Sequence, residues 1–439
     1  MNQKKLDQEK SMKKFMIIWI GQFVSILGSG LTTFGLSVWV LEATGSAMTF
    51  TMTVLMRILP GIIFAPIAGT VADRKNRKNI IIFTDAFDAL LKMFMIILLI
   101  TGQMKLWMIF PINFISAVFG TFQGPAFTAS IPEIVPKKNL GRANGMMQLI
   151  PSIQNIIAPV VAGALYPLIG LSGLLTIDFI TFFVAIGTVL SQKIPQPVIE
   201  DKRVNMGNII NDFKYTLTYL KGKQGFFSLI AVFALLNFIA NLCIVLVGPI
   251  IMGNYNSVIY GMVNSISGIA LVLGGLVASV IPTIKNRVKA IFISLILSGI
   301  GLCVMGVSPV WYIIGVGFFI FMLPVPFTNA TLGTIMQLKI EGKVLGRVGA
   351  VIDGLLKIIT PVAIVLSGVL AEKVFNPLLI DGGTLANTWI GSLIGVGKNR
   401  GIGLMFILSG LILCVVCVLM LFNKVVMNLE ENNPDAVLD

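Results

Sequence analysis

Long apolar stretches separated by short polar segments organise this 439-residue chain. A helix needs about 20 apolar residues to cross roughly 30 Å of hydrocarbon, because each residue adds about 1.5 Å. The pattern predicts twelve membrane-spanning helices, at residues 15–41, 48–72, 79–101, 106–130, 143–166, 170–190, 225–252, 257–282, 288–306, 310–335, 346–373 and 401–422. The chain is therefore predicted to be an all-α membrane protein.

The basic residues between these stretches alternate in density along the chain. With the N-terminus placed in the cytoplasm, the cytoplasmic segments carry 25 Lys and Arg residues and the outer loops carry 4. Lys and Arg accumulate in the cytoplasmic loops of membrane proteins. The alternation supports the twelve-span count, and it predicts an inner (plasma) membrane protein with both termini in the cytoplasm.

The composition narrows the classes of function. Hydrophobic residues make up 56% of the chain and charged residues 12%, about half of the charged share of soluble domains. The net charge of +13 sits in short loops, so it is interpreted as orienting the chain and not as binding nucleic acid. Histidine is absent, so any proton-handling step must use Asp or Glu. The four cysteines lie in apolar stretches and predict helix packing, with no metal and no cofactor.

The longest polar segment, residues 192–224, falls at the middle of the chain. It predicts an N-terminal six-helix bundle over 1–191, a cytoplasmic linker over 192–224 and a C-terminal six-helix bundle over 225–439. Apolar residues at helical spacing in the linker predict an amphipathic helix on the inner leaflet. They are Ile209, Ile210, Phe213, Leu217 and Leu220.

The two halves resemble each other in sequence. LGRANG at 140–145 opens the fifth predicted span, and LGRVGA at 345–350 opens the eleventh. A proline follows well inside each span, at Pro159 and Pro361. Two six-helix halves related by parallel repetition predict a substrate site at their interface, near the middle of the membrane.

The loop between the second and third spans carries a motif. Residues 69–78 read GTVADRKNRK. This resembles the signature G-x-x-x-D-R-x-G-R-K of the major facilitator superfamily, with Asn76 at the position of the second glycine. The resemblance implies a conformational latch made of Gly69, Asp73, Arg74 and Arg77. Within it, Gly69 would let helices approach closely, and Asp73 would lie opposite a helix N-terminus.

Further stretches narrow the resemblance to one branch of that superfamily. MRILPGIIFAPIAG at 56–69 and PAFTASIPEIVPKKNLGRANG at 125–145 are similar to the drug-exporter branch of macrolide-efflux proteins and the enterobactin exporter. The exporter motif G-P-x-x-G-G of the fifth span occurs here only as APVVAG at 158–163. The resemblance implies a secondary active transporter that exports hydrophobic or amphiphilic small molecules, including antibiotics, as a proton antiporter.

Charged residues inside the predicted spans are candidates for energy coupling, because a charge at the bilayer centre costs about 2.5–3.5 kcal/mol or more. Asp88 and Lys92 on the third span are interpreted as a self-neutralising pair whose lysine extends toward the membrane surface. Asp353 is favoured because desolvation at its depth and a cation one turn away oppose each other. The candidates for proton coupling are Asp353, Lys357, Arg57, Asp178 and Glu42.

The resemblance implies that the first, fourth, seventh and tenth helices line the substrate cavity. The polar and aromatic candidates on them are Gln22, Phe34, Asn113, Gln123, Asn237, Asn241 and Phe319. The expected partners are a small amphiphilic substrate, protons and the lipid bilayer around a monomer. The sequence does not identify the substrate.

Other functions were weighed against transport. The chain has no histidine, no phosphate-binding G-x-x-x-x-G-K-[ST] motif and no paired-cysteine metal site, so it is predicted not to be an enzyme. Two alternatives remain open: a lipid or lysophospholipid flippase of the same fold, and a non-transporting membrane scaffold.

Overall fold

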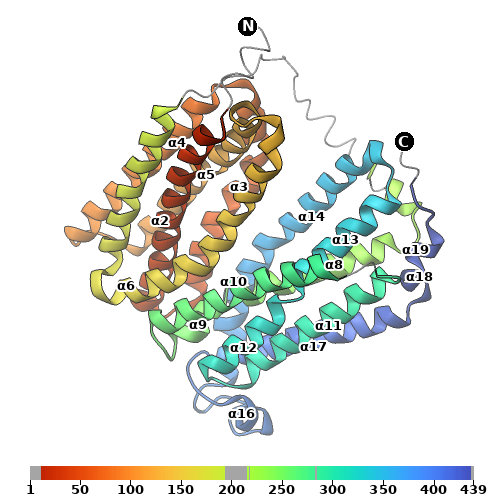
Figure 1. Ribbon diagram of the computed structural model, residues 1–439. Helices are drawn as coiled ribbons and strands as arrows, with labels where there is room; N and C mark the ends of the chain where they lie inside the picture. The colour runs from red at the N-terminus through yellow and green to blue at the C-terminus, as the bar shows by residue number, and fades with distance from the viewer. Residues whose placement is uncertain (1–10, 193–214, 217, 282–283, 437–439) are drawn as a thin grey trace. The chain divides into compact units, whose positions relative to one another are not determined.

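The computed structural model describes residues 11–192, 215–216, 218–281 and 284–436. These residues are folded almost entirely into helices, and no strand occurs among them (Figure 1). The chain divides into two compact units. The first comprises the described residues of Met1–Thr44, Met52–Arg203 and Tyr260–Ser265, and the second those of Gly45–Thr51, Val204–Ile259 and Ile266–Asp439.

Five long helices supply most of the first unit. They are α2 (Met12–Thr44), α3 (Ala47–Arg74), α4 (Arg77–Ile100), α5 (Leu106–Ile134) and α6 (Leu140–Ser191), and the short 3-10 turn η1 (Lys137–Asn139) precedes α6. Helix α2 packs along α6, and α4 packs against both α5 and α6. Helix α4 therefore contacts two other helices of this unit.

Helix α6 contains both the fifth and the sixth predicted spans. It is 52 residues long, and its one interior residue with non-helical dihedral angles is Gly170, with φ 62° and ψ −171°. A positive φ favours glycine, because a Cβ atom would clash there. Gly170 thus marks the bend between the two predicted spans.

The second unit is built from shorter helices in close packing. They are α8 (Phe226–Ile244), α9 (Val247–Met252), α10 (Ser257–Val280), α11 (Arg287–Val307), α12 (Trp311–Met322), α13 (Val325–Lys339), α14 (Gly342–Val369), η2 (Leu370–Phe375), α15 (Asn376–Leu378), α16 (Trp389–Ile394), α17 (Arg400–Phe422), α18 (Lys424–Met427) and α19 (Leu429–Asn432). Helix α11 packs against α12 and α17, and α14 packs against α8. The predicted loop 374–400 holds the short helices α15 and α16.

Among the described residues, ten helices are long and apolar enough to cross a membrane. One of the ten includes both halves of α6, on either side of Gly170. Helix α4 is a further 24-residue helix that carries Asp85, Asp88 and Lys92 in its middle. The predicted all-α membrane fold is confirmed, and the count of twelve spans stays a prediction.

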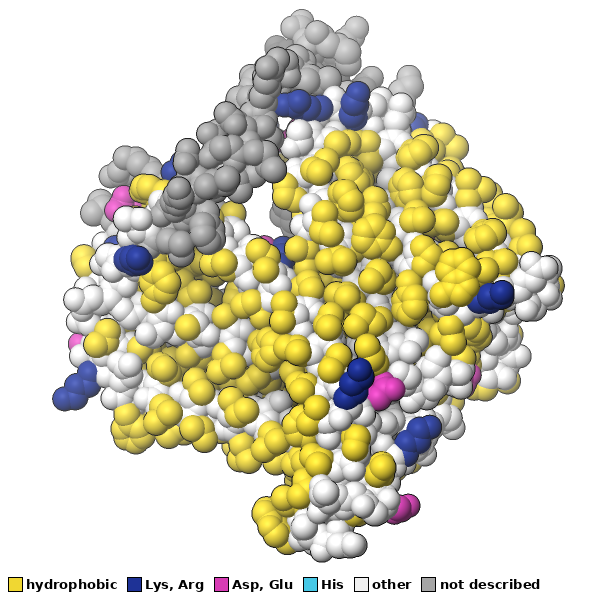
Figure 2. All heavy atoms as spheres, turned by 180° about the vertical axis from the view of Figure 1, so that it is seen from behind, with side chains coloured by type: hydrophobic (Ala, Val, Ile, Leu, Met, Phe, Trp, Pro, Cys, Tyr) yellow, Lys and Arg dark blue, Asp and Glu magenta, His cyan; other side chains and the backbone are white. Residues whose placement is uncertain are grey.

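The outer surface of the helices is apolar. In Figure 2, hydrophobic side chains cover most of the visible face. On α4, Phe83, Leu90 and Ile97 are 61%, 55% and 51% exposed, and their seven-residue spacing places them on one stripe. Asp85 and Lys92, on the other side of the same helix, are buried. Helix α4 thus turns its apolar face outward, as contact with lipid requires, and its polar face inward.

Most of the predicted amphipathic linker helix lies outside the described residues, including Ile209, Ile210, Phe213 and Leu217. Leu220 is described, is helical and is 3% exposed. The linker helix and the domain boundaries at 191 and 225 therefore stay predictions.

Candidate functional site

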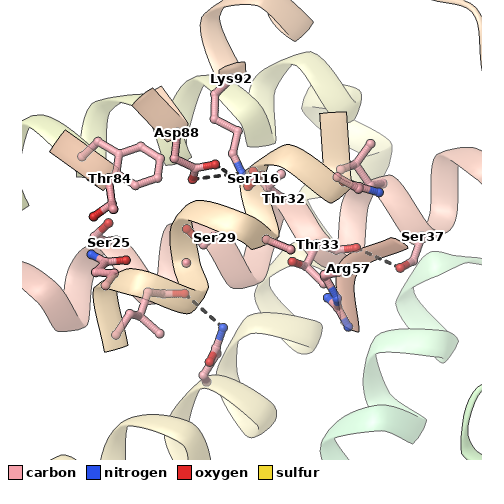
Figure 3. Close-up of a pocket in the computed structure, with 18 of the residues that line it drawn as sticks. Ser25, Ser29, Thr32, Thr33, Ser37, Arg57, Thr84, Asp88, Lys92 and Ser116 are labelled. Carbon is pink, nitrogen blue, oxygen red and sulfur yellow. Dashed lines mark hydrogen bonds and ion pairs between the residues drawn. The ribbon is translucent and has the colours of Figure 1, made fainter. Parts of the chain in front are cut away.

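A cavity of about 260 Å³ lies inside the first unit, among α2 to α6 (Figure 3). Hydroxyl groups make up much of its wall: those of Ser25, Ser29, Thr32, Thr33, Ser37, Thr53, Thr84 and Ser116. Drug-sized ligands occupy sites of roughly 300–1,000 Å³. A cavity of this size can hold ordered water or one polar part of such a ligand.

Helix α4 supplies the charged part of the wall. Thr84, Asp88 and Lys92 line the cavity and follow one another at four-residue spacing, which places them on one face of the helix. Asn113 of α5 and Gln154 of α6 add amide groups to the same wall. Asn113, predicted from the sequence as a cavity residue, therefore does face a cavity.

Lys92 lies between two carboxylates on different helices. Its Nζ atom is 3.6 Å from Asp88 Oδ2 on α4 and 3.2 Å from Asp178 Oδ2 on α6. Lys92 is 7% exposed and Asp178 is fully buried. The interpretation of Asp88 and Lys92 as a self-contained pair with an extended lysine is therefore wrong, because the helix α6 carboxylate draws the lysine inward.

Hydroxyl groups complete the surroundings of both carboxylates. Ser29 Oγ donates to Asp178 Oδ1 at 3.1 Å, and Ser116 Oγ donates to Asp88 Oδ1 (Figure 3 shows the Asp88 side of the cluster). Helix α2 reaches Asp178 because it carries Gly28 there, where a Cβ atom would lie 3.1 Å from the Cα atom of Asp178. The cluster therefore joins α2, α4, α5 and α6 around the cavity.

A second buried carboxylate, Asp85, is held by amides. It is 1% exposed. Gln22 Nε2 of α2 donates to Asp85 Oδ2 at 3.2 Å, and Gln123 Nε2 of α5 donates to Asp85 Oδ1 at 2.5 Å and to Gln22 Oε1 at 3.1 Å. In the part of the chain that the structure describes, no three His, Cys, Asp or Glu side chains gather closely enough to hold a metal ion.

A smaller cavity of about 230 Å³ adjoins the first. Gln22, Phe127 and Met147 are in its wall, and Ile26, Gly120 and Gln123 are shared with the larger cavity. Gln123 therefore contacts both cavities and Asp85. Gln22 and Gln123, which the sequence analysis predicted as separate cavity residues, belong to one hydrogen-bonded cluster.

Arg57 of α3 also lines the larger cavity, and its side chain is exposed (Figure 3). It makes no hydrogen bond or ion pair with any other residue that the structure describes. A guanidinium presents five N–H donors in a planar fork. Arg57 thus offers unoccupied donors to whatever enters the cavity.

The loop between α3 and α4 contains the motif residues. Helix α3 ends at Arg74, and α4 begins at Arg77. Asn76 has extended dihedral angles, and its side chain accepts a hydrogen bond from the backbone N–H of Asn79. Asparagine is a favoured N-cap residue, so capping of α4 accounts for Asn76 at the position where the signature has glycine.

The four latch residues differ in their surroundings. Arg77 is 8% exposed, and its guanidinium donates to the carbonyl oxygens of Ala72 at 3.2 Å and Ala129 at 2.6 Å. It therefore fixes the loop to the end of α5. Asp73 is exposed and makes no ion pair with a described residue. A Cβ atom at Gly69 would meet nothing within 4 Å, and the close helix approach expected at Gly69 stays a prediction.

In the second unit, Asp353 and Lys357 pair with each other on α14. Lys357 Nζ lies 2.6 Å from Asp353 Oδ2, and the side chains are 62% and 63% exposed respectively. The predicted cation one turn away from Asp353 is therefore in contact with it, and the role of Asp353 in energy coupling stays a prediction.

The remaining predicted residues lie on several helices of the two units. Asn237 and Asn241 donate to carbonyl groups one turn earlier on their own helix, at 3.1 and 2.8 Å. Phe319 is half-buried on α12, and Phe34 is 6% exposed on α2. Glu42, near the end of α2, accepts a hydrogen bond from the hydroxyl of Tyr166 at 2.8 Å. The roles predicted for these residues, in the substrate cavity and for Glu42 in proton coupling, stay predictions.

Asp85 is the residue that sequence reasoning missed. The signal was present on α4, where Asp85, Asp88 and Lys92 recur at spacings of three and four, opposite the apolar stripe of Phe83 and Leu90. Helical spacing of that kind predicts a polar face. When Asp88 and Lys92 are treated as an isolated pair, Asp85 is left out of the polar face to which it belongs.

A sequence profile of the Major Facilitator Superfamily matches residues 18–363. The match covers most of the chain, and the chain belongs to this superfamily. The predicted family is thereby confirmed, and with it the class of protein: an integral membrane protein of a transporter family.

Individual proteins are also similar to this chain. The chain is 29% identical to macrolide efflux protein A of Streptococcus pyogenes over 383 residues, which cover 85% of this chain and 93% of that protein. It is also 29% identical to macrolide efflux protein A of Enterococcus faecalis over 330 residues, 73% of this chain and all of that protein. The crystal structure of a bacterial homologue of the human lysosomal transporter Spinster, in an inward-facing and unoccupied conformation, is similar with a TM-score of 0.66 at 14% identity, over 93% of this chain and 96% of that one. The resemblance to macrolide-efflux proteins predicted from the sequence is confirmed.

Proposed function

We propose that this chain exports hydrophobic or amphiphilic small molecules, macrolides among them, in exchange for protons and by alternating access. The substrate class is supported by the similarity to macrolide efflux proteins, which extends over 93% of the Streptococcus pyogenes protein. Export proceeds from a plasma-membrane monomer with both termini in the cytoplasm, in keeping with the distribution of Lys and Arg among the loops.

The observation that carries the proposal is the charged wall of the cavity in the first unit. Asp88, Lys92 and Asp178 lie together between membrane-spanning helices. Charged groups at such depth are costly and are found chiefly on ion and substrate pathways. The cluster holds two carboxylates and one ammonium group, so moving the lysine away from either carboxylate changes which charges are compensated.

Proton exchange requires a carboxylate, because the chain has no histidine. Of the carboxylates predicted for this role, Asp178 is buried beside the cavity, Glu42 lies near the end of α2, and Asp353 is exposed on α14. Asp178 is the most enclosed of the three, and Lys92 compensates its charge. Asp353 stays a candidate, and Asp353→Asn is its test.

An accumulation assay tests the proposal. Cells of an efflux-deficient bacterial strain that make the protein should accumulate several-fold less radiolabelled erythromycin than cells without it, and an uncoupler should abolish the difference. A fluorescent lysophospholipid, offered in parallel, tests the flippase alternative. Redistribution of the lipid between leaflets together with unchanged erythromycin accumulation would contradict drug export.

A further inference from the structure

Asp85 differs from the other buried carboxylates of the first unit in having no cation. Asp88 and Asp178 both contact Lys92, whereas Asp85 is bonded only to the amides of Gln22 and Gln123 among the described residues. Asp85 and Gln22 are each 1% exposed. The carboxylate is therefore enclosed, and its only polar contacts are two neutral side chains.

The charged groups near Asp85 have other partners. Asp88, one turn further along α4, is paired with Lys92, which also holds Asp178 on α6. Arg77, two turns earlier on α4, donates to backbone carbonyls. Helices α2 and α5 present only amides to Asp85 in the described part of the chain. No neighbouring ammonium or guanidinium group thus compensates its charge.

Two opposed effects act on this carboxyl group. Enclosure in an apolar interior makes its charged form costly. Two N–H donors stabilise the charged form, since hydrogen bonds to an ionised acceptor are stronger than those between neutral groups. The protonation state of Asp85 therefore depends on whether both amides continue to donate to it.

A glutamine amide can form a hydrogen bond with a carboxyl group in either protonation state. Each amide has an NH₂ donor on one side and a carbonyl acceptor on the other. As observed, Gln123 Nε2 donates to Asp85 and to Gln22 Oε1. When Asp85 carries a proton, its O–H needs an acceptor, and a half-turn of the Gln123 amide supplies Oε1 in place of the donor. The same half-turn removes the Gln123 donor from Gln22 Oε1, so protonation of Asp85 also changes the pairing of Gln22.

Gln123 also carries the change to the cavities, since it lines both of them. With Asp85 charged, the amide donates toward Asp85, and its carbonyl oxygen is available to the cavity. With Asp85 protonated, the carbonyl accepts from Asp85, and the NH₂ group is available instead. A hydroxyl-rich ligand that donates to Gln123 in the cavity therefore favours the charged form of Asp85.

We propose that Asp85 is the proton-binding residue of the transporter and that Gln123 couples its protonation to the polar groups of a bound macrolide. The inference rests on the proposed proton-coupled export. As the macrolide enters, the O–H bond of Asp85 breaks, the proton passes to water on the side from which the macrolide came, and the carboxylate takes both amide donors. On the opposite side, a proton binds Asp85, Gln123 reverses, and the macrolide leaves.

Proton release on binding tests the inference without requiring transport. Erythromycin is added to the purified full-length protein in weakly buffered detergent solution, and a pH-sensitive dye and radiolabel report released protons and bound macrolide. The wild type should release about one proton per bound macrolide. Asp85→Asn should still bind macrolide and release none. Asp381→Asn, an exposed carboxyl of the loop between α15 and α16, should behave as the wild type.

If Asp85→Asn does not fold, two further variants test the inference. Asp85→Glu should restore release, and Gln123→Met, which keeps the volume but removes the amide, should bind macrolide with release reduced at least two-fold. Normal release by Asp85→Asn, or loss of release only in Asp353→Asn, overturns the inference and leaves the proposed function standing. Failure of the wild type to bind erythromycin defeats the proposed function, and the inference with it.

Discussion

Lys92 Nζ on α4 lies 3.2 Å from Asp178 Oδ2 on α6, and both side chains are buried. The contact joins two residues that are more than 80 positions apart in the sequence, and it occurs beside the cavity of the first unit. The stability of the first unit and the charge of its cavity therefore depend on the same ion pair.

Removing Lys92 should destabilise the protein strongly. Lys92→Met leaves Asp178 buried with Ser29 as its hydrogen-bond donor and no cation, and breaking a buried pair costs about 3–5 kcal/mol. Thermal unfolding in detergent, followed by circular dichroism, should show a clear fall in Tm. The double variant Lys92→Met with Asp178→Leu should recover much of the loss, since it removes the fully buried carboxylate and leaves only Asp88, which is partly exposed and keeps Ser116 as a donor, without its cation. Simple addition of the two single effects would contradict the pairing.

The motif loop should control transport more than folding. Asp73→Asn should leave the protein at normal abundance and cut macrolide export at least ten-fold, because Asp73 is exposed and pairs with no described residue in this conformation. Its role would then lie in another conformation. Lys75→Gln, an exposed change in the same loop, is the matched control and should export normally. Wild-type export by Asp73→Asn would remove the latch from the account.

Arg77 should behave differently from Asp73. Its guanidinium bonds two carbonyl oxygens, on α3 and α5, so Arg77→Gln leaves those buried acceptors without a charged donor. We expect lower abundance and a lower Tm as well as reduced export. A stable Arg77→Gln protein with unchanged Tm would show that the two contacts do not fix the loop.

The orientation of the chain can be tested by labelling. Asn254 lies exposed just before α10. In a cysteine-free background, a single cysteine at Ser392 or at Asn254 should react with a membrane-impermeant maleimide that is added to intact cells. Cysteines at Asn139 and Asn286 should react only after the membrane is opened. Labelling of Asn286→Cys in intact cells would contradict the predicted arrangement of spans in the second half.

The C-terminal segment is fastened to the second unit through Lys339. The Lys339 ammonium group, at the end of α13, donates to the carbonyl oxygens of Glu430 at 2.6 Å and Asn433 at 2.8 Å, and lies 2.7 Å from Asp435 Oδ1. The hydrogen bond from Lys339 holds the pKa of the exposed Asp435 carboxyl below its usual value. The ionic contact between Lys339 and Asp435 is therefore complete at pH values above the usual pKa of an aspartate. It weakens only as the pH falls through the lowered pKa of Asp435.

Lys339→Met should release this segment. A Glu-specific protease should then cut after Glu430 or Glu431 several-fold faster than in the wild type, as mass spectrometry of the C-terminal fragment would record. Lys424→Met, an exposed lysine of the same segment, is the control. Equal cutting rates in the Lys339→Met protein and the wild type would mean that the other contacts, such as Arg287 with Glu430 at 2.6 Å, hold the segment alone.

Hydrophobic length predicted the all-α membrane fold, because the length of a spanning helix follows from the thickness of the bilayer. The orientation predicted from the basic residues stays a prediction. The division of 143–190 into the spans 143–166 and 170–190 agrees with the positive φ of Gly170. Gln22 of α2 and Gln123 of α5 are hydrogen-bonded to each other, and their role as substrate-cavity residues stays a prediction.

The sequence could not give the partners of those residues. Whether Asp353 or Asp85 is enclosed depends on which face of its helix meets a neighbour, and the two differ by 63% against 1% exposure. The reach of Lys92 to Asp178 likewise depends on the packing of α4 on α6. Such contacts are set by tertiary packing and leave no mark in span length or charge count.

Uptake by liposomes that contain the purified protein tests proton-coupled export most directly. With an acid interior and a neutral exterior, outward proton flow should drive radiolabelled erythromycin into the liposomes well above the equilibrium level, and an uncoupler should return it to that level. The Asp381→Asn protein should accumulate as much as the wild type. Accumulation that is the same with and without the imposed proton gradient, or the same in liposomes that lack the protein, would contradict the account.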